Sequence, residues 1–151
     1  MSATGLEVFD KTLQITHTWL GEIMAELGPD RQVAYHALRA VLHALRDRLP
    51  LELAAHLGAQ LPLLVRGIYY DSWHPRPETS RERSQKEFLG HVGEGLQGIR
   101  PVNPEQATRV VFGVVARHVA EGQAEKVRQA LPKDVQALWP GSANQAGSAA
   151  G

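Results

Sequence analysis

The chain has 151 residues, with 16 basic side chains against 16 acidic ones, and it contains no cysteine. A length of this order suits one domain, or two small repeats that share a core. The balanced charge argues against a nucleic-acid binder, which needs a basic face, and the lack of cysteine excludes disulfides and thiolate metal sites. No apolar run approaches the ~18 residues of a membrane span, and no basic segment precedes an apolar one at the N-terminus. We therefore expect a cytoplasmic protein that does not cross a membrane.

The first part of the chain predicts two helices of ordinary length. Thr4 and Glu7 have the spacing of a capping box, which marks a helix start. Apolar residues then recur every three or four positions until Gly28-Pro29 ends the pattern. Asp30 suits the cap of a second helix, whose apolar stripe covers residues 33–45.

Two Leu-Pro pairs punctuate the segment that follows. Leu49-Pro50 interrupts the second helix and suits the first turn of a third, over about residues 51–60. Leu61-Pro62 repeats the arrangement and predicts a fourth, short helix that ends near Tyr70. The two prolines in residues 71–77 leave no room for a helix there, so we expect a connector.

The second half opens with two overlapping capping signals, Thr79-x-x-Glu82 and Ser84-x-x-Glu87. The helix after them carries glycines at positions 90, 93, 95 and 98. Each glycine weakens a helix by up to about 1 kcal/mol relative to alanine, or else it allows close backbone packing. Asn103-Pro104 predicts the start of the next helix.

Two short helices are expected at the end of the chain, over residues 123–131 and 132–139. Residues 141–151 contain glycine, alanine and serine without any large apolar side chain, so we expect a disordered tail. The folded part is then a single all-helical domain over residues 1–140.

The second Leu-Pro corner recurs 70 positions further on, which suggests an internal duplication. The corresponding positions are Leu61 with Leu131, Pro62 with Pro132, Val65 with Val135 and Ile68 with Leu138. A shift of 73 pairs the apolar positions of the earlier helices in the same way. We predict an all-α fold of two tandem pseudo-repeats, about residues 6–73 and 80–139, each with about four helices, packed into one helical globule.

Three short motifs follow one another along the chain. Residues 42–49 have the form Leu-x-x-Leu-x-x-Arg-Leu, residues 59–62 read Ala-Gln-Leu-Pro, and residues 87–89 read Glu-Phe-Leu before the second Leu-Pro. Their order resembles that of a bacterial family known as domain of unknown function 2267, over about residues 8–139. The resemblance implies an all-helical two-repeat fold, and it brings no agreed activity, cofactor or catalytic residue. The glycine-rich helix after Ser84 departs from the family pattern.

Residues that could perform chemistry form no recognised pattern. Glu87 and His91 have helical i, i+4 spacing and could hold a metal, with a third ligand such as His17. There is no nucleophile elbow and no phosphate-binding loop. We therefore expect a non-enzymatic protein with no cofactor, no metal and no catalytic residue. One alternative is a small-ligand or metal-binding protein or enzyme, with a pocket between the repeats near His74 and the Glu87/His91 pair. The other is a helix-turn-helix nucleic-acid binder, which the zero net charge disfavours.

The two halves differ most at the end of the first one. Leu63 and Leu64 correspond to Lys133 and Asp134 under the shift of 70, so the first half carries more apolar surface than its counterpart. Either the other half or the connector covers this surface, or it contacts a partner protein or a second copy. The partner hypothesis assigns the contact to Leu53, Leu57, Leu63, Leu64, Tyr69, Tyr70 and Trp73.

Overall fold

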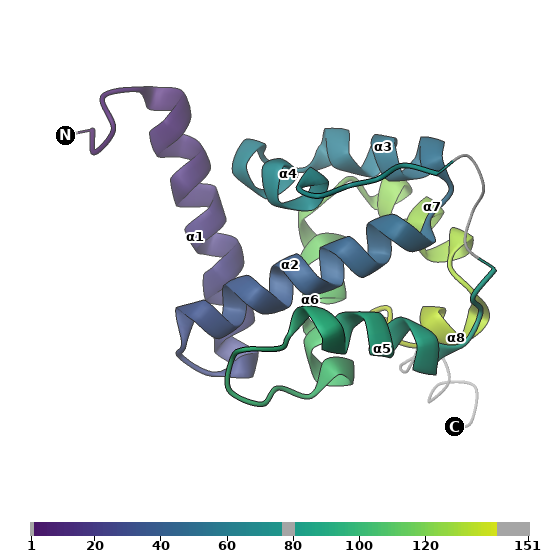
Figure 1. Cartoon of the computed structure of the whole chain (residues 1–151). Coiled ribbons are helices and arrows are strands. Elements are labelled where there is room, and N and C mark those ends of the chain that lie inside the picture. Colours follow the sequence, from purple (N-terminus) through teal and green to yellow (C-terminus); the bar gives the residue numbers. More distant parts are fainter. Residues whose placement is uncertain (1, 77–80, 142–151) are drawn as a thin grey trace.

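The structure is a computed structural model that describes residues 2–76 and 81–141 (Figure 1). The described residues form eight helices and no strand, which confirms the predicted all-α class. In chain order the helices are α1 (Glu7–Leu27), α2 (Arg31–Arg48), α3 (Leu51–Gln60), α4 (Leu63–Tyr70), α5 (Gln85–Gly95), α6 (Pro104–His118), α7 (Glu121–Ala130) and α8 (Lys133–Gln136). The capping signal at Thr79 and the tail from residue 142 onward lie outside the described residues.

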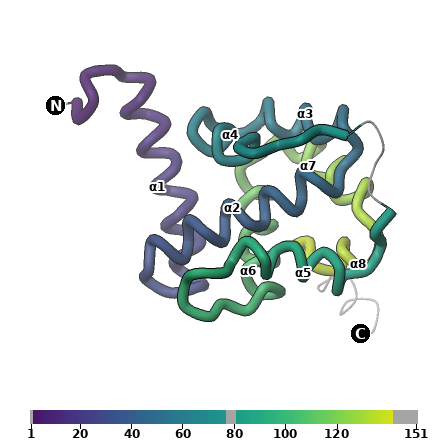
Figure 2. Tube along the Cα trace, in the orientation of Figure 1, coloured from purple at the N-terminus to yellow at the C-terminus, as the bar shows by residue number. Residues whose placement is uncertain are grey.

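Helix α2 is the centre of the molecule. It packs against α1, α4, α5 and α6, and Figure 2 shows it passing between the α3–α4 pair and α5. Helix α6 packs against α1, α2, α5 and α7. The N-terminal end of α1 projects beyond the rest of the molecule, whereas the remainder of the helix meets α2, α4 and α6 (Figures 1 and 2).

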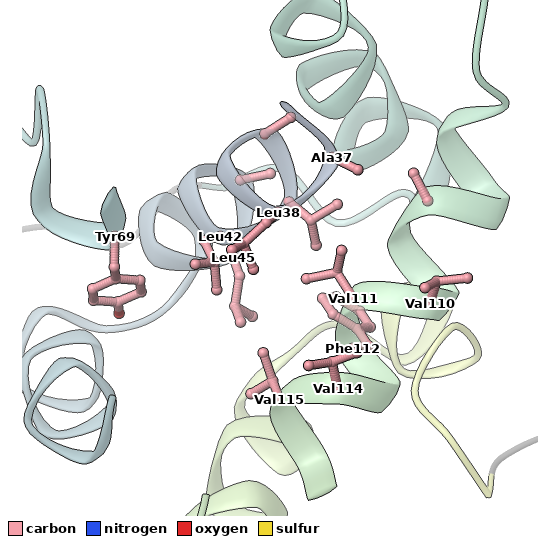
Figure 3. Packing of buried hydrophobic residues seen from close by; sticks show 14 of the residues in the cluster. Ala37, Leu38, Leu42, Leu45, Tyr69, Val110, Val111, Phe112, Val114 and Val115 are labelled. Carbon is pink, nitrogen blue, oxygen red and sulfur yellow. The ribbon is translucent and has the colours of Figure 1, made fainter. Parts of the chain in front are cut away.

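The core lies between α2 and α6. On α2, the fully buried Leu38, Leu42 and Leu45 follow helical spacing, so they form one stripe. Residues 110–115 of α6 are all buried, as expected for a helix with neighbours on every side. Figure 3 shows these side chains facing one another across the interface. Complete burial of each leucine stabilises the fold by about 1.5–3 kcal/mol.

The two Leu-Pro corners have the same backbone geometry. At Leu61-Pro62 the φ and ψ angles are −82° and 146°, then −58° and 154°. At Leu131-Pro132 they are −80° and 149°, then −56° and 149°. Val65 and Val135, each four residues after its leucine, are both buried. Each corner therefore ends one helix and begins the next by the same local rule, because proline fixes φ and suits the start of a helix.

Three of the predicted helix caps form as expected. Asp30 accepts from the amides of residues 32 and 33, Ser84 and Glu87 form a capping box, and Asn103 accepts from the amide of residue 106. The predicted box at Thr4 is wrong. The Thr4 hydroxyl and amide both donate to the carboxylate of Asp10 instead, and α1 begins after Leu6 without a side-chain cap. The Thr4 amide, which a capping box would give to Glu7, is bonded to Asp10, and Leu6 instead of Thr4 precedes the first helical residue.

One glycine of α5 explains how this helix packs so closely on α2. A β-carbon at Gly95 would lie 2.7 Å from the Ala40 β-carbon and 3.2 Å from its α-carbon. Nothing lies within 4 Å of the corresponding position at Gly90. Of the two explanations for the glycines in this helix, close packing therefore applies at Gly95 and not at Gly90.

Candidate functional site

The structure divides the seven predicted contact residues into three groups. Leu57 and Tyr69 are fully buried, at 0% exposure, and belong to the core. The Tyr69 hydroxyl donates to the carbonyl oxygen of Ala54 over 2.7 Å, and burial raises the pKa of this phenol. These two residues are not available to a partner, which corrects the expectation that assigned them to a surface. The reason is helical spacing, because Val65 and Tyr69 share the face of α4 that meets α2 and α3.

Leu53, Tyr70 and Trp73 are half-buried and pack against the edge of the core. The rings of Tyr70 and Trp73 stack with their centroids 5.3 Å apart. The Tyr70 ring also lies over Gly58, where a β-carbon would come within 2.1 Å of the hydroxyl oxygen. For these three residues, the chain itself provides much of the cover.

Leu63 and Leu64 are exposed, at 50% and 38%, and lie in the first turn of α4. The amide of Leu64 donates to the Thr12 hydroxyl of α1 over 2.9 Å. This bond satisfies one of the amides that every helix leaves free at its N-terminus. It also fixes α1 beside the exposed leucines.

The projecting end of α1 carries the remaining exposed apolar side chains of this region. Leu6, Val8, Phe9 and Leu13 are all exposed. By helical spacing, the last three continue the stripe that buries Trp19 and neighbouring residues further along α1. The α1/α4 surface is defined here as Leu6, Val8, Phe9, Leu13, Leu63 and Leu64.

The sequence predicted an apolar stripe on this helix but did not separate its exposed part from its buried part. One signal was available. Counting 73 positions on from residues 8–13 leads to residues 81–86, which contain no large apolar side chain. The first two turns of α1 therefore have no apolar counterpart in the second half, so a shared core did not require them.

A second feature is a cavity of about 990 Å³ between α2 and α5, bordered also by segments 72–76 and 81–84. His74 and His91, which the sequence placed near such a pocket, both line it. Glu87 does not, because its carboxylate accepts from the Ser84 hydroxyl and amide at 2.8 and 3.3 Å. The charged side chains of the lining are Arg39, Arg46, Asp47, Arg48, Arg76, Arg81, Glu82 and Glu94.

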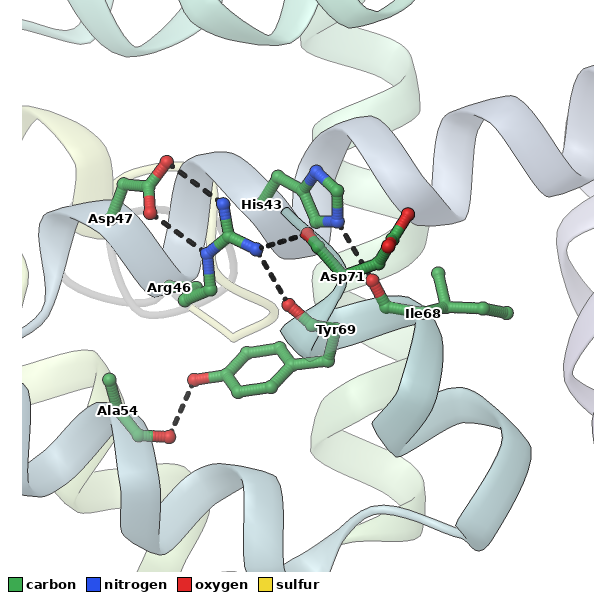
Figure 4. Close-up of polar contacts among 7 residues, drawn as sticks. All are labelled: His43, Arg46, Asp47, Ala54, Ile68, Tyr69 and Asp71. Carbon is green, nitrogen blue, oxygen red and sulfur yellow. Dashed lines mark hydrogen bonds and ion pairs between the residues drawn. The ribbon is translucent and has the colours of Figure 1, made fainter. Parts of the chain in front are cut away.

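Arg46 and His43 bind the cavity wall to the end of α4 (Figure 4). Arg46 Nη1 donates to the carbonyl oxygens of Tyr69 and Asp71, each over 2.9 Å, while Nε and Nη2 pair with Asp47. His43 Nε2 lies 2.8 Å from the carbonyl oxygen of Ile68. Burial lowers the pKa of His43, so its ring is neutral near pH 7 and donates through this nitrogen.

The other histidine of the cavity is also paired. His91 Nε2 lies 2.7 Å from Glu82 Oε2, and its Nδ1 lies 4.0 Å from Glu94 Oε2. Within residues 2–76 and 81–141, no group of three or more histidine or carboxylate side chains could hold a metal ion. His17, named as a third ligand, lies on α1 and is exposed.

Residues 16–138 match the family described as "Uncharacterized conserved protein (DUF2267)". The chain belongs to the DUF2267 family. No curated protein matches it. The DUF2267 match contains every helix that lines the cavity, whereas residues 6–13 of the α1/α4 surface precede it. Among the helices of the described residues, none is both long enough and apolar enough to span a membrane.

Proposed function

We propose that this DUF2267 protein is a non-enzymatic helical interaction module that binds the apolar face of another helix through its α1/α4 surface. The supporting observation is the projecting end of α1, whose exposed apolar stripe runs beside Leu63 and Leu64 at the start of α4. Exposed apolar side chains that gather on neighbouring elements are a feature of association sites.

The occupant that best fits this surface is the same surface of a second copy. A contact with two-fold symmetry uses one patch on both molecules, so the patch must be complementary to itself. An exposed helix with an apolar stripe meets this requirement, because two such helices can pack along their stripes. The partner's α1 would then lie against α1 and the leucines of α4.

The energetics favour a weak dimer. Covering the exposed part of one such side chain contributes about 1 kcal/mol, so six on each copy contribute on the order of 10 kcal/mol. Association itself costs about 4–15 kcal/mol. The two terms are comparable, so we expect a dimer whose population depends on protein concentration.

Sedimentation velocity over a range of concentrations tests the proposal. The wild-type chain should shift from monomer to dimer, and the double variant Leu13→Glu/Leu64→Glu should stay monomeric with an unchanged circular dichroism spectrum. Leu51→Glu is the matched control, because Leu51 is equally apolar and 43% exposed but begins α3 at the end away from α4. A wild-type chain that stays monomeric at every concentration contradicts the proposal, as does a dimer that the double variant leaves intact.

We also infer that the fold is an internal duplication. The equal geometry of the two Leu-Pro corners supports it, and so does the packing. Exchanging α1–α4 for α5–α8 converts the α1–α6 contact into α5–α2 and the α1–α4 contact into α5–α8, and it leaves the α2–α6 and α3–α7 contacts unchanged. A crystal structure in which α2–α4 cannot be superimposed on α6–α8, in the same order and direction, would rule the duplication out.

A further inference from the structure

Arg48 is a buried arginine with an unused donor. It is the last residue of α2, only 6% exposed, and it lines the cavity between α2 and α5. Its Nε has no hydrogen-bond acceptor among the described residues. Burial and the neighbouring charge of Arg83 both lower its pKa, so the fold disfavours the guanidinium charge at this position. A buried donor without an acceptor is costly, and buried polar groups are normally hydrogen-bonded.

Arg46, two residues earlier, shows how an arginine that only supports the fold is bound at this helix end. It is similarly buried, at 4% exposure, and its guanidinium donates to two backbone carbonyls and to both carboxylate oxygens of Asp47. The same helix end therefore carries one arginine whose donors are engaged and one whose Nε is not. Acceptors therefore face the guanidinium of Arg46, which holds the end of α4, whereas none in the described part of the chain faces the Nε of Arg48.

The carboxylates of the cavity are engaged elsewhere. Asp47 pairs with Arg46, Glu82 lies against His91, and Glu94 lies 4.0 Å from the other nitrogen of the same ring. Glu82 still stabilises the Arg48 charge from a distance, which limits the depression of its pKa. The lining holds five arginines against three carboxylates, and Arg39 also pairs with Asp71 outside the lining, so a small excess of positive charge remains.

Part of the remaining lining is apolar, beside the serines and histidines. Leu49, Leu51, Phe88 and Val135 contribute side chains to it, together with Trp73 from the connector. A cavity of about 990 Å³ is of the size that holds a small organic molecule. A wall that combines arginine side chains with an apolar portion suits a ligand with an anionic head group and an apolar body.

We propose that the cavity between α2 and α5 binds an organic anion, whose carboxylate or phosphate head group accepts from the Arg48 guanidinium and whose apolar body lies against Phe88 and the leucines at the start of α3. The planar guanidinium fork suits either head group. The site is distinct from the α1/α4 surface, and it stands whether or not the chain dimerises.

Isothermal titration calorimetry with four probes tests the site. Decanoate and decyl phosphate carry the two head groups on the same apolar body, decanol carries the body without a charge, and inorganic phosphate carries a head group without a body. We expect decanoate or decyl phosphate to bind at least tenfold more tightly than decanol and than inorganic phosphate. Comparing the affinities of decanoate and decyl phosphate shows which head group the site prefers. Equal binding of decanol, or no binding of either amphiphile, overturns the proposal.

Two variants separate Arg48 from the general charge of the region. Arg48→Met keeps the length of the apolar stem and should weaken binding of the preferred amphiphile at least tenfold. Arg83→Met removes the same charge from an exposed neighbour that does not line the cavity, and it should change binding less than threefold. The thermal midpoint of ligand-free Arg48→Met should equal or exceed that of the wild type, because an apolar side chain replaces a buried guanidinium whose Nε has no acceptor in residues 2–76 and 81–141. Unchanged affinity in Arg48→Met overturns the proposal.

A measurement on the wild-type chain does not depend on how the variants fold. The ¹⁵N–¹H resonance of Arg48 Nε should shift on titration with the preferred amphiphile, because this donor gains an acceptor. The Nε resonance of Arg46, which is already bonded, should shift much less. An Arg48 resonance that stays in place while calorimetry reports binding would show that the ligand lies elsewhere, and it also overturns the proposal.

Discussion

Arg46 of α2 binds the last turn of α4 through its Nη1, which donates to the carbonyl oxygen of Tyr69 over 2.9 Å. The last carbonyls of any helix lack partners within that helix. Together with His43, which binds the carbonyl of Ile68, Arg46 supplies donors from the neighbouring helix instead. The polar end of α4 is thereby fixed to α2, while Tyr69 fills the core beneath it (Figure 4).

Replacing Arg46 with methionine should lower the free energy of unfolding by about 2–4 kcal/mol. The variant leaves the buried carbonyl of Tyr69 and the partly buried carbonyl of Asp71 without this donor, at about 1–3 kcal/mol for a buried group, and solvent and relaxation recover part of the cost. Urea denaturation followed by circular dichroism measures the change. Arg39→Met is the control, because Arg39 lies on the same helix but forms a partly exposed pair with Asp71, which contributes about 0–1 kcal/mol. Equal losses in the two variants would contradict the assignment.

The buried ring of His43 should make the fold less stable in mild acid. Its pKa in the folded chain lies below the ordinary value of 6.5, because burial disfavours the charged ring. The unfolded chain therefore takes up a proton first as the pH falls below about 6.5, and the free energy of unfolding decreases until the folded ring also titrates. His43→Gln should remove this part of the pH dependence. Urea midpoints measured from pH 8 to 5 for both chains test it, and parallel curves would contradict the prediction.

The boundaries of α3 and α4 could be predicted from the sequence because their causes are local. Proline fixes its own φ angle and restricts the residue before it. Leu49-Pro50 and Leu61-Pro62 therefore determine where α3 and α4 begin, whatever surrounds them, and the observed starts at Leu51 and Leu63 agree with the expectation.

The exposure of individual apolar residues could not be predicted in the same way, since it depends on which helices meet. Leu13 and Leu20 belong to one stripe of α1, yet only Leu20 reaches the core, because the N-terminal end of α1 extends past its neighbours. Within α4 the spacing did contain the answer. Tyr69 is four residues after the buried Val65 and shares its face, whereas Leu64 lies off that face and is exposed.

The Nε of Arg48, unbonded within the segments that the structure describes, also could not be predicted from the sequence. Arg46 and Arg48 are two residues apart at the end of one helix, and the sequence around them does not distinguish their environments. They differ because the end of α4, about 25 residues further on, brings its carbonyls to Arg46 and not to Arg48. Only the tertiary structure shows that, among the residues described, the Nε of Arg46 has an acceptor and the Nε of Arg48 has none.

Replacing two glycines of α5 with alanine should have opposite effects on stability, because Gly95 lies against α2 and Gly90 does not. Gly95→Ala should destabilise the fold by about 1–3 kcal/mol, because the new methyl group would overlap Ala40 and push the helices apart. Gly90→Ala meets open space and should stabilise α5 by up to about 1 kcal/mol through helix propensity. Thermal denaturation of both variants provides the comparison. A stabilised Gly95→Ala would show that the two helices are not held in close contact.

Glu22 should stabilise the packing of α1 on α6 only while its carboxylate is ionised, so we expect acid to remove this stabilisation. Its carboxylate pairs with Arg117 over 2.7 Å and with His118 over 2.5 Å, and the His118 ring stacks on Trp19 with the centroids 5.0 Å apart. Partial burial raises the pKa of Glu22, but the hydrogen bonds from His118 and Arg117 outweigh it and hold the pKa below the ordinary 4.5.

Because the folded-state pKa of Glu22 is the lower one, its contribution is present above pH 4.5 and is lost as the pH falls through that lower value. Glu22→Gln should therefore destabilise the fold by about 0.5–1 kcal/mol near neutral pH, as expected for a partly exposed ion pair. The difference from the wild type should disappear in acid. Glu26→Gln, one turn further along α1 at an exposed position, is the matched control and should change little at any pH. A loss in Glu22→Gln that persists undiminished in acid would mean that side-chain packing, and not the carboxylate charge, holds α1 against α6.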